Sequence, residues 1–275
     1  YSGGGVESVG SIVVSGTGPE NGILDYRYYS FDRDGNTNIN FGGGTGKAIT
    51  NFASTVEDHG TVLKLYNYGT YTNSYMAGGT IYKADGSSGF GIVRENQYGV
   101  IDSTWSSNAS AFKTTEYFTA GSKNTLVDLA VQSDGKVIAL GYVTDATNKN
   151  SIELVRYTSS GIVDTTFGTN GYLAISLSTS VTPSDLKLTA DQILIGATIQ
   201  NATQSSDFAV FVRDQDGHAL FPVVQTVVAP LLFSLSSTPL ARPEISGTAL
   251  RNTTVRIFDG TIQIGTSTVN SQGVW

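Results

Sequence analysis

The residues with the clearest capacity for chemistry lie in one short stretch, where carboxylate and amide side chains alternate: Asp32, Asp34, Asn36 and Asn38. Oxygen ligands suit a hard cation, so the spacing predicts a Ca²⁺ site, and Ca²⁺ is the only cofactor that the sequence suggests. An EF-hand loop is not formed, because Gly35 stands at the fourth place instead of the sixth and no Glu follows at the twelfth. The alternative interpretation is a hairpin turn with an Asx-type hydrogen bond.

Tyrosine gathers in a second stretch, LYNYGTYTNSY (65–75), which interrupts the repeat described below. An insertion that breaks a repeat is a candidate binding loop, because binding residues concentrate on loops held by a rigid scaffold. The sequence therefore predicts a surface for a glycan or a protein partner at four aromatic side chains: Tyr66, Tyr68, Tyr71 and Tyr75.

No set of residues predicts catalysis. The chain has no Cys, which excludes thiol nucleophiles and Cys-ligated metals. Its two histidines, His59 and His218, have no partner at metal-ligand spacing, and the Gly-x-Ser-x-Gly pattern of a serine nucleophile elbow is absent. No pair of carboxylates for glycosidic chemistry can be named. We therefore expect a protein that is not an enzyme.

The composition narrows the class of protein further. Charged residues make up 14% of the 275 residues and the net charge is −7, whereas an average soluble domain has roughly 25% charged residues. The acidic balance argues against a nucleic-acid surface, and no apolar run reaches the roughly 20 residues of a membrane-spanning helix. Gly, Ser, Thr, Asn and Tyr replace the missing charges and favour strands and turns.

Two sets of glycines recur about every 60 residues and reveal an internal repeat. One set ends a short apolar run, and the other lies in a polar turn. The first set is Gly16, Gly79, Gly141 and Gly196; the second is Gly35, Gly99, Gly161 and Gly217. Each unit reads as three or four short antiparallel strands, with no helical periodicity between them. The fold class is therefore all-β.

A unit of this size cannot bury its own sheet faces, so the units must stack, and radial stacking gives a β-propeller. We place about four copies at residues 6–56, 57–120, 121–180 and 181–222. Several side chains recur at equivalent places, namely Arg94, Arg156 and Arg213, then Asp102 and Asp164, then Phe41, Trp105 and Phe167. We expect the charged residues to lock turns within or between blades and the aromatic ones to fill the space between blades. The alternative is a ligand-binding ring.

Residues 131–171 also carry a recognisable pattern, with Asp134-Gly135-Lys136, then Arg156-Tyr157, then Asp164 and Phe167-Gly168. This pattern resembles the bacterial delta-60 repeat, a family of secreted and surface proteins thought to form β-propellers. The resemblance spans about residues 6–221, is clear in one copy and is degraded in the other three. It implies a propeller-type fold and a place at the bacterial cell surface.

The composition changes after Pro222, and the phrases PEISGTA and TTVRIFDG resemble the bacterial immunoglobulin-like repeats of large adhesins. A sandwich of that type needs about 100 residues, and the segment is about half as long. Residues 223–275 are therefore expected to be a linker followed by an incomplete immunoglobulin-like domain.

Together these features predict a non-enzymatic extracellular surface protein of a bacterium, a scaffold for adhesion or display and a fragment of a larger multidomain adhesin. One alternative is a structural subunit of a filament or sheath that assembles through incomplete sheet edges. A second is a glycan-binding or glycan-active propeller. The expected partners are further copies of the chain, other surface proteins or a glycan, and not nucleic acid.

Overall fold

The computed structural model describes residues 5–8, 10–52, 56–106, 113–116, 121–200, 206–219, 225–226, 231–233, 246–248, 254–259, 262–272 and 274–275. The chain divides into two compact units, residues 1–222 and residues 223–275. Each unit is described separately below.

The strands of the first unit follow one another as antiparallel meanders of four strands, which we call blades 1 to 4. Blade 1 contains β1 (Gly5–Ser8), β2 (Ser11–Glu20), β3 (Ile23–Asp32) and β4 (Lys47–Thr50), with a short 3-10 turn, η1 (Gly42–Gly44), before β4. Blade 2 contains β5 (Asp58–Tyr68), β6 (Tyr71–Tyr82), β7 (Ser88–Glu95) and β8 (Lys113–Glu116). Blade 3 contains β9 (Lys123–Val131), β10 (Val137–Thr144), β11 (Asn150–Tyr157) and β12 (Tyr172–Ile175). Blade 4 contains β13 (Val181–Leu188), β14 (Gln192–Gln200) and β15 (Ser206–Asp214), and the two-residue β16 (Gln225–Thr226), which comes after the end of this unit, is the fourth strand in its sheet order.

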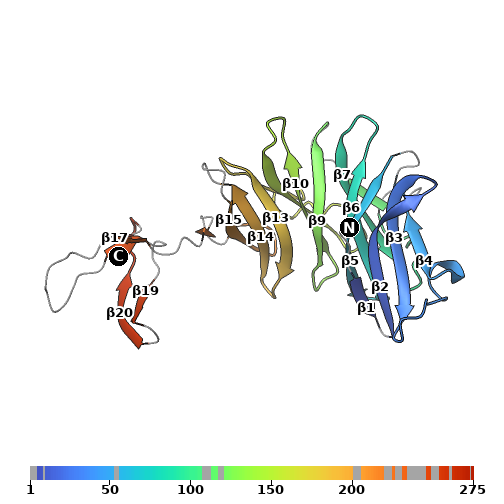
Figure 1. Cartoon of the computed structure of the whole chain (residues 1–275), viewed down its shortest axis with the longest axis horizontal. Coiled ribbons are helices and arrows are strands. Elements are labelled where there is room, and N and C mark those ends of the chain that lie inside the picture. The colour runs from blue at the N-terminus through green and yellow to red at the C-terminus, as the bar shows by residue number, and fades with distance from the viewer. Residues whose placement is uncertain are drawn as a thin grey trace. The chain divides into compact units, whose positions relative to one another are not determined.

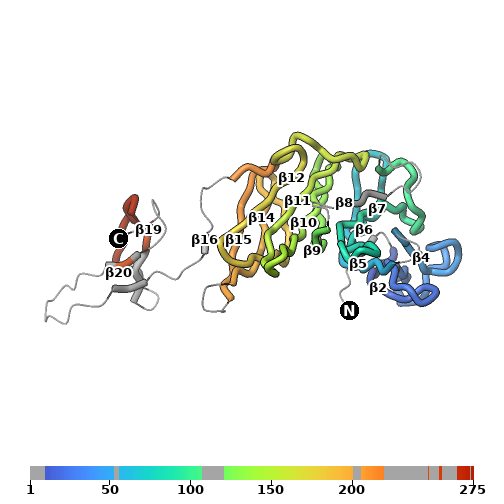
Figure 2. Tube along the Cα trace, turned by 90° about the horizontal axis from the view of Figure 1, so that it is seen from above, coloured from blue at the N-terminus to red at the C-terminus, as the bar shows by residue number. Residues whose placement is uncertain are grey.

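The blades lie in a row in chain order, with blade 1 at one end and blade 4 at the other (Figures 1 and 2). A parallel pairing of Ser88 with Lys123 joins blades 2 and 3 along one edge. The all-β class and the stacked four-stranded units are confirmed. Among the residues that the structure describes, the blades do not close into a ring.

The burial of each strand reflects its place in the row. In β14, buried Ile193, Ile195 and Ala197 alternate with more exposed residues, as expected for a sheet with one covered face. In β10, four consecutive residues from Val137 to Leu140 are fully buried, because blade 3 has a neighbour on both faces.

One turn geometry recurs at the end of the third strand of every blade. The residue that opens the turn accepts a hydrogen bond at its carbonyl oxygen from a glycine three places on: Asp32 from Gly35, Asn96 from Gly99, Thr158 from Gly161 and Asp214 from Gly217. All four glycines have positive φ, between +72° and +89°. This backbone conformation explains the spacing of the turn glycines in the sequence.

The core lies between the blades. One cluster joins Val13, Tyr26 and Tyr28 of blade 1 to Ala77 and Val93 of blade 2. A second joins blades 2 and 3 through Phe90, Ile92 and Trp105 on one side and Ala139, Val155 and Tyr157 on the other. Each blade is thus buried against its neighbour, and burial between sheets is the main source of stability.

In the second unit, β17 (Leu231–Phe233) pairs with β18 (Ser246–Thr248), and β19 (Thr254–Asp259) pairs with β20 (Ile262–Thr268). The backbones of Gly247 and Trp275 exchange two hydrogen bonds of 3.0 Å. Two antiparallel pairs fit part of a sandwich, and the immunoglobulin-like interpretation stays a prediction. Across the described ranges of the chain, no helix has the length and apolar character needed to cross a membrane.

Candidate functional site

Arg94, at the end of β7, is buried at the junction of blades 2 and 3, with only 1% of its surface exposed. Its Nε donates to Asp102 Oδ2 at 2.8 Å, and its Nη2 donates to Thr104 Oγ1 at 3.1 Å. Its Nη1 crosses to blade 3 and donates to the backbone oxygen of Ser159 at 2.8 Å. The guanidinium therefore ties its own blade to the turn of the next one.

Arg156, at the end of β11, repeats this arrangement one blade later. Its Nε pairs with Asp164 Oδ2 at 2.9 Å, and its Nη2 donates to Thr166 Oγ1 at 2.9 Å. Its Nη1 crosses to blade 4, where it donates to the backbone oxygen of Gln215 and to Asp216 Oδ1. Burial opposes the ionisation of Asp164, but the hydrogen bonds from Thr166 and Lys136 and the charge of Arg156 lower its pKa to about 2.

An aromatic side chain completes each junction by packing against the turn glycine of the next blade. A methyl group on that glycine would lie less than 3 Å from the ring in each of three pairs: Phe41 with Gly99, Trp105 with Gly161, and Phe167 with Gly217. The residue after each ring donates a backbone hydrogen bond into the same turn: Gly42 to Tyr98, Ser106 to Ser160, and Gly168 to Asp216. We call the ring together with the arginine, where one is present, the latch.

Seven of the eight predicted repeat residues lie at the junctions between blades. Arg94, Arg156, Asp102 and Asp164 join turns within and between blades, and the three aromatic rings are fully buried between blades. Blade 1 has Ser30 in place of the arginine, and Asn38 Nδ2 donates to its hydroxyl at 3.1 Å.

The assignment of Arg213 to the same position is wrong. Arg94 and Arg156 stand five residues before their turn glycines, whereas Arg213 stands four residues before Gly217. The backbone of Arg213 forms an isolated β-bridge to Ala219. The equivalent bridge in blade 3 joins Val163 to Tyr157, which is the residue after Arg156. Because successive strand residues face opposite sides, Arg213 points away from the latch. The residue at the arginine position is Val212.

The Ca²⁺ residues form the turn that the alternative interpretation describes. Asp32 Oδ1 accepts the backbone N–H groups of Asp34 at 2.9 Å and Asn36 at 2.8 Å, and its Oδ2 accepts from Asn36 Nδ2. The Asn36 hydrogen bonds are the main cause of the lowered pKa of Asp32. Asn38 turns to Ser30 and Asn40. The oxygens of Asp32 are thus committed to Asx-type bonds, and the geometry does not support the Ca²⁺ interpretation.

The tyrosine-rich stretch forms the hairpin between β5 and β6, in which Tyr68 pairs with Tyr71 and the register shifts between Tyr66 and Tyr68. Tyr66 and Tyr75 are fully buried, so the prediction of a ligand surface is wrong for these two. Tyr66 donates from its hydroxyl to the backbone oxygen of Gly135 in blade 3 at 3.0 Å. Tyr71 covers Arg94, with its ring centre 3.7 Å from the guanidinium carbon, an attractive cation–π geometry. Tyr68 is 39% exposed, and a binding role for it stays a prediction.

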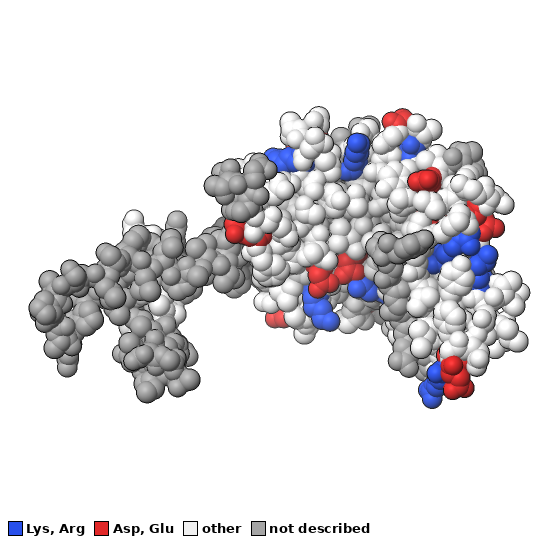
Figure 3. Space-filling model, in the orientation of Figure 1, with Lys and Arg blue, Asp and Glu red and all other residues white. Residues whose placement is uncertain are grey.

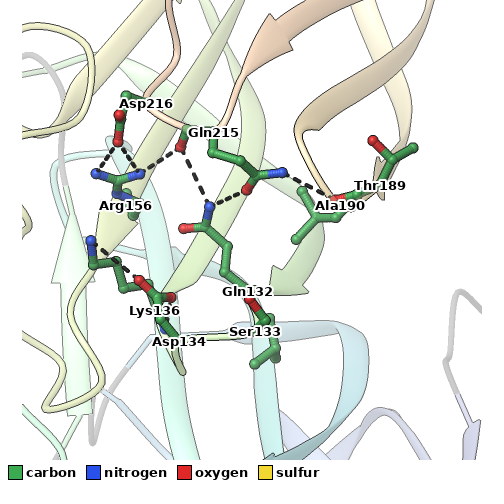
Figure 4. A pocket seen from close by; sticks show the side chains of 11 residues that line it. Gln132, Ser133, Asp134, Lys136, Arg156, Thr189, Ala190, Gln215 and Asp216 are labelled. Atoms are coloured by element: carbon green, nitrogen blue, oxygen red, sulfur yellow. Dashed lines mark hydrogen bonds and ion pairs between the residues drawn. The ribbon is translucent and has the colours of Figure 1, made fainter.

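Between blades 3 and 4, the equivalent groove is open and forms a pocket of about 420 Å³. Three turns line it, at residues 131–136, 188–190 and 215–216, together with Arg156 (Figure 4). The β9–β10 hairpin is shorter than the β5–β6 hairpin. The strand pairing places Gln132 at the position of Tyr66 and Lys136 at that of Ser74. The tyrosines fill the groove between blades 2 and 3, and this hairpin leaves its groove open.

The pocket offers both donors and acceptors. Lys136 Nζ lies 3.3 Å from Asp134 Oδ2 and 3.2 Å from Asp164 Oδ2. Gln132 is 9% exposed, and its Nε2 donates to the side chain and the backbone of Gln215. Its Oε1 is buried without a hydrogen-bond partner and points away from Gln215, toward the space beside Arg156 and Lys136 (Figure 4). A ligand with an N–H or O–H group would satisfy this oxygen.

Sequence reasoning missed Gln132 and Gln215, because neither belongs to a motif and only the difference in hairpin length reveals the groove. Elsewhere, charged side chains are scattered over the face shown in Figure 3, and most of its described surface belongs to uncharged residues. No group of three or more His, Cys, Asp or Glu suited to a metal ion occurs among the described residues.

A comparison with protein families matches residues 132–167 to a β-propeller domain of unknown function, DUF5122. The matched stretch runs from the β9–β10 turn to the aromatic latch residue Phe167, so it contains most of one blade junction. It indicates a propeller-type repeat. No curated protein and no solved structure matches the chain.

Proposed function

We propose that the chain is a non-enzymatic scaffold on the exterior of a bacterial cell, where its blades and the segment after them serve in adhesion or display. The observation that carries this proposal is the latch. The charged and aromatic residues that recur in the sequence are used to hold one blade on the next. Repeated chemistry of this kind builds an extended surface and does not assemble a reaction centre.

Two further features support an extracellular place. The chain lacks Cys and is poor in charge, and its pattern resembles the delta-60 repeat of secreted and surface proteins. The resemblance of residues 223–275 to the immunoglobulin-like repeats of adhesins supports a position within a longer surface protein.

The test is localisation and adherence in the producing bacterium. Antibodies raised against the chain are expected to label intact cells, and protease treatment of intact cells is expected to remove that label. Deletion of the coding region should lower adherence to surfaces or to other cells. Labelling seen only after permeabilisation, or turnover of a glycan by the purified chain, would contradict the proposal.

The pocket between blades 3 and 4 favours a second candidate function, the binding of a glycan. Its donors and acceptors, Lys136 Nζ, the Asp134 carboxylate and Gln132 Oε1, suit the hydroxyl groups of a sugar. We would measure binding on a glycan array with the wild-type chain, with D134A and K136A, and with K187A, which changes an exposed lysine that does not line the pocket. Signals lost in the first two variants and kept in the third would support this function. Equal signals in all four would refute it.

A further inference from the structure

Blade 1 exposes an apolar sheet face at the end of the row. Ile12, Val14 and Tyr29 are 43%, 37% and 40% exposed. Val14 of β2 lies directly opposite Tyr29 of β3, and Ile12 lies opposite Phe31, so these side chains share one face of the sheet. The opposite face of the same strands, with Val13, Tyr26 and Tyr28, is buried against blade 2.

The corresponding pairs in the other blades are buried. The cross-strand pair equivalent to Val14 and Tyr29 is Ala77 with Val93 in blade 2, Ala139 with Val155 in blade 3, and Ile195 with Phe211 in blade 4. None of these six side chains is more than 3% exposed. In blades 2 and 3 the preceding blade covers the pair, because Phe41 and Tyr28 lie in the cluster of Val93, and Trp105 and Tyr66 lie in that of Val155. We call this face the receiving face.

The turn that follows the third strand of blade 1 also has no aromatic ring packed on its glycine. The turn glycines of blades 2, 3 and 4 each carry an aromatic ring from the blade before, whereas a methyl group on Gly35 would meet nothing within 4 Å. Asp34 precedes Gly35 as Asp216 precedes Gly217, and Asp216 pairs with the guanidinium of Arg156. Asp34 is exposed. Blade 1 therefore has the carboxylate, the bare glycine and the apolar face of a complete latch acceptor.

Within the described part of the chain, every latch is already used at a junction. The latches of blades 1, 2 and 3 are engaged with the next blade. In the sequence of blade 4, the positions of the latch arginine, aspartate, threonine and aromatic residue are occupied by other types: Val212, Leu220, Pro222 and Val223. A second copy of the chain thus lacks the residues needed to dock head to tail in the same way.

We propose that the receiving face of blade 1 is a docking surface for one more blade of the same repeat type, contributed by a sequence other than the four blades of this chain. That blade carries an arginine at the end of its third strand and an aromatic residue followed by glycine. Its ring packs on Gly35, its guanidinium pairs with Asp34, and its sheet covers Val14 and Tyr29. The interface continues the three junctions already present in the row.

The test supplies such a blade in front of the full chain. Residues 121–180, which contain Arg156 and Phe167, are duplicated and fused before Tyr1. A matched control carries R156S and F167A in the added copy only. The measurement is the rate of nitration of Tyr29 by tetranitromethane, located by mass spectrometry. Tyr98, 50% exposed in the turn of blade 2, is the internal reference.

We expect nitration of Tyr29, relative to Tyr98, to slow at least fivefold in the fusion and to stay at the rate of the unfused chain in the control. An unchanged rate in the fusion, or equal slowing in fusion and control, overturns the proposal. Sedimentation of the unfused chain provides a second measurement that does not depend on folding of the added blade. A dimer in which Tyr29 is protected would show that a second copy covers this face, and would also overturn the proposal.

Discussion

Glu95 gives the sharpest prediction, because it places a titratable group between blades 1 and 2. The side chain is 1% exposed, and burial raises its pKa from 4.5 to about 8. The hydroxyl of Thr50 in blade 1 donates to its Oε1 at 2.8 Å, and its Oε2 has no hydrogen-bond partner among the described residues. Between about pH 4.5 and pH 8, the folded protein holds this proton and the unfolded chain has lost it.

The sign follows from linkage. The folded state binds more protons than the unfolded state in this window, so the free energy of unfolding falls as the pH rises, by about 1.4 kcal/mol per pH unit. The loss is complete above pH 8, where the folded state also carries the charge. E95Q keeps an oxygen to accept from Thr50 and cannot ionise. We therefore expect E95Q to remove this slope and to be more stable than the wild type above pH 8.

The assay is urea unfolding followed by circular dichroism at half-unit steps from pH 4.5 to pH 8.5. Glu153, whose pKa burial raises to about 7, contributes equally to wild type and E95Q, so the difference between them isolates Glu95. E57Q, at an exposed side chain, is the matched control and should follow the wild-type curve. Parallel curves for E95Q and wild type would refute the argument that Glu95 is buried in its protonated form.

Three further predictions concern the latch and the turns. R156A should lower the free energy of unfolding by about 3–5 kcal/mol, because it leaves the buried Asp164 carboxylate without its arginine partner and removes the contacts to blade 4; a loss below 1 kcal/mol in urea melts would contradict this. G161A should destabilise the chain more than G35A. Both glycines have φ near +80°, but only at Gly161 would the methyl group meet Trp105, so equal melting temperatures would show that the ring contact is unimportant. Addition of EDTA should leave the melting temperature unchanged, since the Asp32 oxygens accept hydrogen bonds within their own turn; a fall that added Ca²⁺ reverses would restore the Ca²⁺ interpretation.

The repeat could be predicted because the backbone conformation of its turns requires glycine. Gly99 and Gly161 need positive φ and no side chain where a ring packs on them, so their spacing survives when the strands diverge. The role of Arg156 could be predicted for a different reason, because a buried charge needs its ion-pair partners.

The predictions that were wrong depend on the strand register at single residues and on side-chain packing. Arg213 differs from the latch position by one residue, a shift that turns its side chain to the other face of the strand. Tyr66 and Tyr75 look like loop residues in the sequence, but strands β5 and β6 extend through them and bury their rings. The pocket beside Gln132 results from a shorter hairpin, and such a difference has no motif.

The contacts of the latch can form only in the order in which the blades are synthesised. Arg94 finds its acceptor on Ser159, 65 residues further along the chain, and Arg156 finds Asp216 60 residues further along. During translation, which delivers the N-terminal blades first, each arginine is in place before the turn that supplies its cross-blade acceptor exists. In a nascent blade the arginine already pairs with the aspartate of its own blade, but its Nη1 lacks an acceptor until the next blade folds against it. Completion of each blade thus depends on the next one.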